Sequence, residues 1–121
     1  MCAHPSGAGK HRSDLSFVLQ LENTQLQIER QSQIVQSQLA SLYQSYLSNI
    51  SLLELERKNE GIAKQNLEIT LEKFKIGSVA PIEFRTAQEN YGNAVIRLTT
   101  AELQTKQSEI SLRELAGSLS F

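Results

Sequence analysis

The residues able to do chemistry gather near the N-terminus, without the partners that such chemistry requires. The run from His4 to Arg12 reads HPSGAGKHR and partly matches the pattern of a phosphate-binding loop. That loop needs a first glycine, a Ser or Thr after its lysine, and a preceding strand. Here His4 stands in place of the glycine, His11 follows Lys10, and no strand precedes. We interpret the match as coincidental.

The sequence also lacks the residues that a metal site or a catalytic triad requires. His4 and His11 are the only histidines and Cys2 is the only cysteine, so a third metal ligand and an internal disulfide are both lacking. A Ser-His-Asp arrangement needs a scaffold that orients the histidine against a nucleophile. Because the N-terminal segment is expected to be irregular, we predict no catalytic residue, no metal, no cofactor and no enzymatic activity.

The carboxylates favour a solvated helix surface over acid–base chemistry. Glu68 and Glu72 lie one helical turn apart and are followed by Lys73 and Lys75, which is typical of local ion pairing on a helix. The 12 basic and 13 acidic residues are spread along the chain without a basic block. A nucleic-acid partner is therefore not expected.

Composition predicts the elements that carry these residues. The 121 residues include no Trp, four Phe and three Tyr, so little core can form per residue, and two Pro and six Gly leave room for very long helices. We predict an all-α fold, a long antiparallel helical hairpin of coiled-coil type. Its parts are a disordered segment 1–14, a helix 15–76, a turn 77–80, a helix 81–116 and a short tail.

Three cues place the turn. Gly77 suits the left-handed position just past a helix end. Pro81 suits the first turn of the next helix, where its missing N–H costs nothing. Glu83 then lies where a carboxylate favours the positive start of a helix.

The second helix shows the strongest periodicity in the sequence. Two rows of residues, each seven apart, run along it and predict a left-handed supercoiled packing seam. The first six members of this seam are Phe84, Ala87, Tyr91, Ala94, Leu98 and Ala101. Phe84 and Tyr91 are interpreted as packing residues rather than channel-lining ones.

Two apolar stripes run side by side near the end of the first helix. One comprises Leu55, Ile62, Ile69 and Ile76, and the other comprises Ala63, Leu67, Leu71 and Phe74. Two stripes on one helix indicate two neighbours, as in a ring of helices.

The segment from about Leu21 to Leu119 resembles the repeat of TolC-type outer-membrane efflux proteins, most closely the C-terminal repeat. In that family a long helix ends with an aromatic residue, a basic residue and Gly, followed by a turn, a branched apolar residue with an acid, Ala-Gln, and finally Leu and Gly. The matching residues here are Glu60, Ala63, Asn66, Phe74, Lys75, Gly77, Ile82, Glu83, Ala87, Gln88, Leu115 and Gly117. Ala80 and Thr86 depart from the pattern, and residues 1–20 stand where barrel strands are expected.

The resemblance implies a passive conduit in the outer membrane and periplasm of a Gram-negative bacterium. It implies a homotrimer whose membrane barrel is absent from this chain, working with a periplasmic adaptor and an inner-membrane pump. Carried over by position, the adaptor-docking tip is Gly77, Ser78, Val79 and Ala80, and Glu83 is the acid at the tunnel mouth.

The alternative is a coiled-coil interaction module, such as an adaptor-type hairpin or a scaffold. Such a module needs only one apolar seam per helix, whereas residues 55–76 carry two stripes. No stretch reaches the roughly 20 apolar residues of a spanning helix, and no signal peptide is visible.

Overall fold

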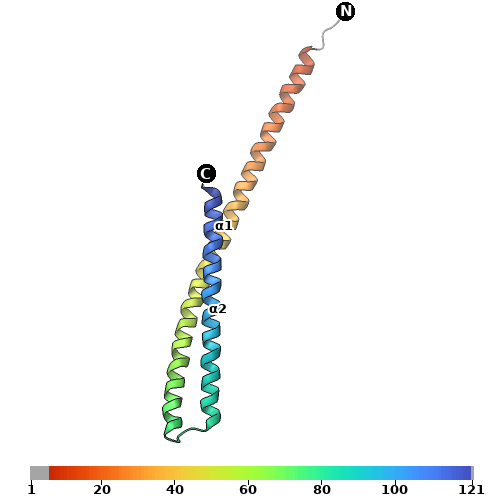
Figure 1. Cartoon of the computed structure of the whole chain (residues 1–121). Coiled ribbons are helices and arrows are strands. Elements are labelled where there is room, and N and C mark those ends of the chain that lie inside the picture. Colours follow the sequence, from red (N-terminus) through yellow and green to blue (C-terminus); the bar gives the residue numbers. More distant parts are fainter. Residues whose placement is uncertain (1–5, 121) are drawn as a thin grey trace, which may run out of the picture. The chain divides into compact units, whose positions relative to one another are not determined.

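The computed structural model describes residues 6–120, and nearly all of them are helical (Figure 1). Helix α1 spans Ser6–Lys75 and helix α2 spans Pro81–Leu119, with no strand among the described residues. No proline occurs between Pro5 and Pro81, so nothing in α1 removes a backbone donor from its ladder. The all-α prediction is confirmed.

Helix α1 begins earlier than predicted. The segment 1–14 was expected to be disordered, but α1 starts at Ser6 rather than at Leu15. For residues 6–14 the prediction is wrong; residues 1–5 lie outside the described residues. Gly7 and Gly9 each cost about 1 kcal/mol in a helix, yet extending an existing helix avoids the larger cost of nucleation.

Helix α2 also runs past its predicted end. Gly117 was expected to stop the helix at residue 116, but α2 continues to Leu119. A glycine ends a helix when it adopts positive φ, and among the described residues only Gly77 does so. Gly117 therefore remains an ordinary helical residue.

The chain divides into two units, one ending at Gln38 and the other beginning at Leu39. From Ser6 onward the first unit is a single stretch of α1. Its large apolar side chains, among them Phe17, Leu21 and Ile28, are exposed to solvent.

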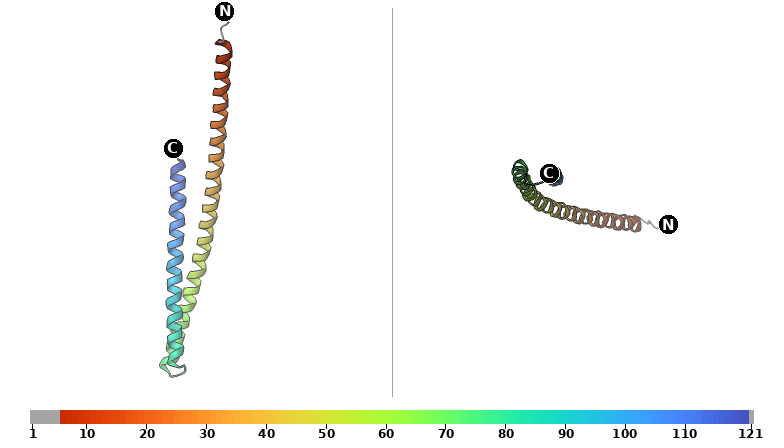
Figure 2. Two further views of the ribbon diagram at one scale, coloured as in Figure 1. Left: turned by 90° about the vertical axis from the view of Figure 1, so that its right-hand side faces the viewer. Right: turned by 90° about the horizontal axis from the view of Figure 1, so that it is seen from below.

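The second unit is the helical hairpin. Its part of α1 and the whole of α2 run antiparallel, side by side in both views, joined by the short turn after Lys75 (Figures 1 and 2). The predicted hairpin is confirmed. Its core is thin: among the side chains that the structure describes, only Ala94 and Ala101 are buried, at 1% and 2% exposure. Small residues there let the two helices approach closely.

Candidate functional site

The tip of the hairpin begins with a hydrogen-bonded glycine cap on α1. Gly77 has φ +75°, the left-handed conformation that a side chain would strain. Its N–H donates to the Phe74 carbonyl over 3.0 Å, and the Ser78 N–H donates to the Lys73 carbonyl over 2.8 Å. This pair of bonds is the Schellman motif, which satisfies carbonyls that a helix end leaves without partners. The turn is therefore held by its own backbone.

The start of α2 completes the tip. Ala80 precedes the helix in an extended conformation and offers no side-chain cap, while Pro81 takes the first helical position. The Ala80 carbonyl accepts the N–H groups of Glu83 at 3.0 Å and Phe84 at 3.4 Å. The exposed Glu83 carboxylate lies in the first turn, where the helix dipole favours a negative charge.

Two aromatic rings join the helices directly behind the tip. Phe74 and Phe84 stack with their ring centroids 5.2 Å apart and their planes 12° from parallel. Such pairs contribute about 0.5–1.5 kcal/mol beyond the burial of their area. Of the four predicted docking residues, three are exposed and Val79 is half-buried.

The predicted packing seam of α2 is its least exposed face. Ala94 and Ala101 are buried, and Phe84, Ala87, Tyr91 and Leu98 are half-buried. On α1 a matching row of half-buried residues recurs in alternate steps of four and three. Its members are Leu42, Tyr46, Asn49, Leu53, Glu56, Glu60, Ala63, Leu67 and Thr70. This spacing is that of a heptad coiled coil.

A polar layer crosses the seam and fixes how the helices align. The Thr105 hydroxyl donates to the Asn49 carbonyl over 3.2 Å. The Asn49 amide donates to the Ser108 hydroxyl over 3.2 Å and to the Gln104 carbonyl over 3.4 Å. Because a displaced register would leave these half-buried groups without partners, the layer selects one alignment.

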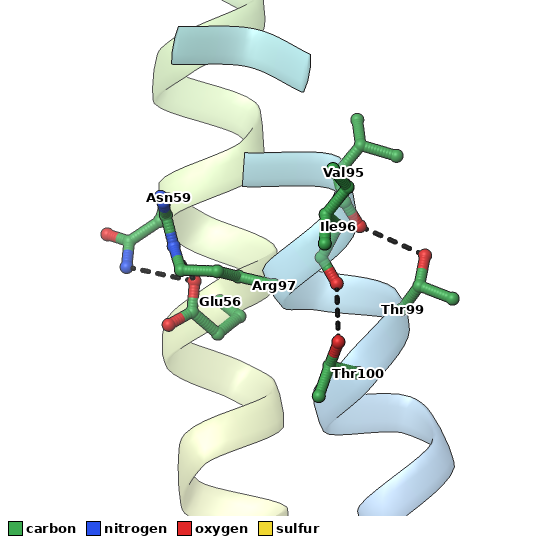
Figure 3. A network of polar contacts seen from close by, with 7 residues as sticks. All are labelled: Glu56, Asn59, Val95, Ile96, Arg97, Thr99 and Thr100. Atoms are coloured by element: carbon green, nitrogen blue, oxygen red, sulfur yellow. Dashed lines mark hydrogen bonds and ion pairs between the residues drawn. The ribbon is translucent and has the colours of Figure 1, made fainter. Parts of the chain in front are cut away.

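A second polar contact lies closer to the tip, where Glu56 occupies a seam position (Figure 3). The Glu56 side chain is only 12% exposed, and its Oε2 accepts the Arg97 Nε–H over 3.3 Å and the Asn59 amide over 3.5 Å. Thr99 and Thr100 instead donate to carbonyls of their own helix. Arg97 thus joins α2 to α1 across the seam.

Glu72 and Glu109 pair with cations of their own helix, whereas Glu102 of α2 pairs with Arg57 of α1 over 3.9 Å. The hydrogen bond from Lys106, together with the charge of Arg113, holds the pKa of Glu109 below its ordinary value. The Glu109 carboxylate lies 2.9 Å from the Lys106 ammonium nitrogen and 2.6 Å from a guanidinium nitrogen of Arg113. Glu72 pairs with Lys75 over 3.0 Å. Local ion pairs thus engage these two glutamates.

Each helix of the hairpin also carries an apolar row that the other helix does not cover. Leu55, Ile62, Ile69 and Ile76, here called the α1 stripe, are 53–79% exposed. The second row was not foreseen from the sequence, because Glu89 interrupts it. It comprises Ile82, Ile96, Leu103 and Ile110, here called the α2 stripe, whose members are 49–65% exposed.

The heptad repeat places both stripes away from the seam. The α2 stripe lies about 180° around its helix from the centre of the seam, and the α1 stripe about 130° around its own, at 3.5 residues per turn. Neither stripe can therefore be covered within the hairpin. Both are available to further helices.

A groove of about 470 Å³ runs between the helices near the tip. Six of its nine lining residues have polar side chains: Asn59, Asn66, Glu83, Thr86, Asn90 and Arg97. These groups can donate and accept hydrogen bonds, but no nucleophile is paired with a base. Among residues 6–120, no group of three His, Cys, Asp or Glu side chains could hold a metal ion.

The N-terminal residues considered for chemistry add no site. His11 is exposed on α1, while Cys2 and His4 lie outside the described residues. Within the described part of the chain, neither helix contains a segment long and apolar enough to span a bilayer. No protein-family model, curated protein or solved structure matches the chain.

Proposed function

We propose that the chain is a helical part of an outer-membrane efflux or secretion channel of TolC type. It acts as a passive conduit, with no bond made or broken, and docks a periplasmic adaptor through its hairpin tip. The observation that carries this proposal is the second, exposed apolar stripe on each helix of the hairpin. A hairpin that functions as a pair alone hides its apolar residues in one seam.

A tubular wall accounts for two stripes per helix. Each helix in such a wall has one neighbour on either side, and each therefore needs two apolar faces. The α1 and α2 stripes supply the second faces. In the intact protein, three subunits with their barrel form the tunnel, and an inner-membrane pump supplies the energy.

The turn supports the second part of the proposal. Gly77, Ser78 and Ala80 are exposed on a backbone that the Schellman bonds hold in one shape, so an adaptor would meet a preformed surface.

Glu83 lies next to these tip residues as the acid of the tunnel mouth, where rings of carboxylates favour cations. Glu83→Gln in the intact channel is expected to weaken block by divalent cations in conductance recordings; unchanged block would remove this role.

Docking is tested with the purified chain and the purified helical hairpin of a periplasmic adaptor, by isothermal titration calorimetry. Ser78→Arg places a long charged side chain at the exposed tip and should weaken binding about tenfold or more, equivalent to about 1.4 kcal/mol. The matched control is Gln107→Arg, an exposed α2 residue far along the chain from the tip, which should leave the Kd unchanged.

Two outcomes contradict docking at the tip: no heat of binding with the unsubstituted chain, or equal losses in both variants. The second candidate function, a coiled-coil interaction module, is favoured by the heptad seam alone. A chain that binds no adaptor and forms no larger assembly fits that candidate.

A further inference from the structure

The polar groove near the tip carries opposite charges at its two ends. On α2 its wall includes Glu83, Asn90 and Arg97, which lie seven residues apart, with Glu83 nearest the tip. In a coiled coil a spacing of seven returns to the same side of the helix, so these three residues lie on one flank. At 1.5 Å per residue the two charged residues are about 21 Å apart along α2. The groove is therefore long and dipolar.

Arg97 is oriented to bind a carboxylate at the end of the groove far from the tip. Its Nε–H donates to the mostly buried Glu56 carboxylate, which fixes the plane of the guanidinium group (Figure 3). Among the described residues, the terminal N–H groups of Arg97 have no hydrogen-bond partner. The outer edge of a guanidinium group offers two parallel donors, which match the two oxygens of a carboxylate.

Glu83 supplies the opposite charge at the tip end. Its carboxylate is exposed, and within the described part of the chain it takes part in no ion pair. An ammonium group has three donors and no acceptor, so it complements an ionised carboxylate. This end of the groove therefore suits a primary amine.

Amide side chains line the groove between these two charges. Asn59 and Asn66 of α1 lie seven residues apart and form the wall opposite Asn90. The Asn59 amide donates to Glu56, while the amides of Asn66 and Asn90 have no hydrogen-bond partner among residues 6–120. Each amide can both donate and accept. A peptide backbone presents N–H and C=O groups in alternation, and such amides can pair with both.

In the proposed channel wall the groove lies on the inner side. Ile62 belongs both to the α1 stripe and to the groove wall, so the stripe and the groove share one flank of the hairpin. On this flank the two neighbours of α1 are about 130° apart at 3.5 residues per turn, which makes this side of the wall concave. A molecule that passes along the tunnel would therefore meet the groove.

From the end charges, their separation and the amides between them, we propose that the groove binds short extended peptides with free termini. The peptide ammonium group pairs with Glu83 and its carboxylate pairs with Arg97, so its N-terminus points towards the tip. An extended chain covers about 3.3–3.6 Å per residue, so about six residues span the distance between the two charges. The inference rests on the proposed function and names a class of substrate for the conduit.

Binding is tested by NMR with the purified chain and hexaglycine, through the side-chain amide signals of Asn66 and Asn90. We expect these signals to shift as hexaglycine is added. Hexaglycine that is acetylated at its N-terminus and amidated at its C-terminus lacks both charges. It should bind at least about tenfold more weakly, equivalent to about 1.4 kcal/mol. Equal affinity for the free and the blocked peptide overturns the proposal.

The orientation of the peptide is tested at the tip end. Glu83→Gln should raise the Kd of hexaglycine about fivefold, as expected for the loss of an exposed ion pair. The Kd of hexaglycine acetylated only at its N-terminus should not change, because that peptide has no ammonium group. Glu89→Gln is the matched control, since it removes the same charge from an exposed α2 residue outside the groove. Equal losses in both variants, or an equal loss for both peptides, rule out the contact with Glu83.

The inference and the proposed function can fail separately. A chain that docks the adaptor hairpin but binds no hexaglycine overturns the inference and leaves the proposed function standing. A chain that binds hexaglycine in the predicted orientation but docks no adaptor supports the groove as a binding site and overturns docking at the tip.

Discussion

The chain reverses direction at one residue, whose backbone conformation other amino acids adopt only with strain. Gly77 has φ +75°, and nothing lies within 4 Å of where its Cβ would be. The obstacle to a side chain is therefore the backbone conformation itself and not a neighbouring atom. Its position was predictable, since a helix that ends at glycine shortly before a proline is a local pattern.

Gly77→Ala is expected to lower the free energy of unfolding by about 1–2 kcal/mol, the cost of a left-handed alanine. Gly92→Ala is the matched control, because Gly92 lies inside α2 with equally open space around its Cβ position. This second change should raise stability by up to about 1 kcal/mol through helix propensity. Urea denaturation followed by circular dichroism measures both, and effects of the same sign would contradict the assignment.

At the scale of the helices, the sequence predicted more about faces than about ends. The heptad rows of α2 place Ala94 and Ala101 on the seam, and these are its buried residues. The residues at which the helices begin and end were less predictable. A glycine ends a helix only where it adopts positive φ, and Gly9 and Gly117 do not. The α2 stripe could not be predicted from the sequence, because Glu89 interrupts its seven-residue repeat of apolar residues.

Ala101→Leu is expected to lower the free energy of unfolding by about 1–3 kcal/mol, because a closely packed seam has no room for the added carbons. Ala116→Leu makes the same change at an exposed position of α2 and should have an effect within about 0.5 kcal/mol. Thermal unfolding followed by circular dichroism compares them. Equal shifts in Tm would show that the seam tolerates larger residues.

At the scale of the whole molecule, the alignment of the helices was the part that sequence reasoning could not supply. A seven-residue repeat defines which faces meet, but a slip of seven residues would preserve those faces. Polar contacts between residues far apart in the sequence decide the register, among them Thr105 with Asn49 and Arg97 with Glu56. Their partners are separated by 56 and 41 positions, and no local pattern links them.

The thin core has a thermodynamic consequence. Only Ala94 and Ala101 are buried among the described side chains. Unfolding therefore exposes little apolar surface area beyond what is already exposed to solvent in the folded hairpin. The heat-capacity increment of unfolding scales with that area, so it is small for a chain of this length. The stability curve is correspondingly flat, and the helices fray gradually from their ends as the temperature rises.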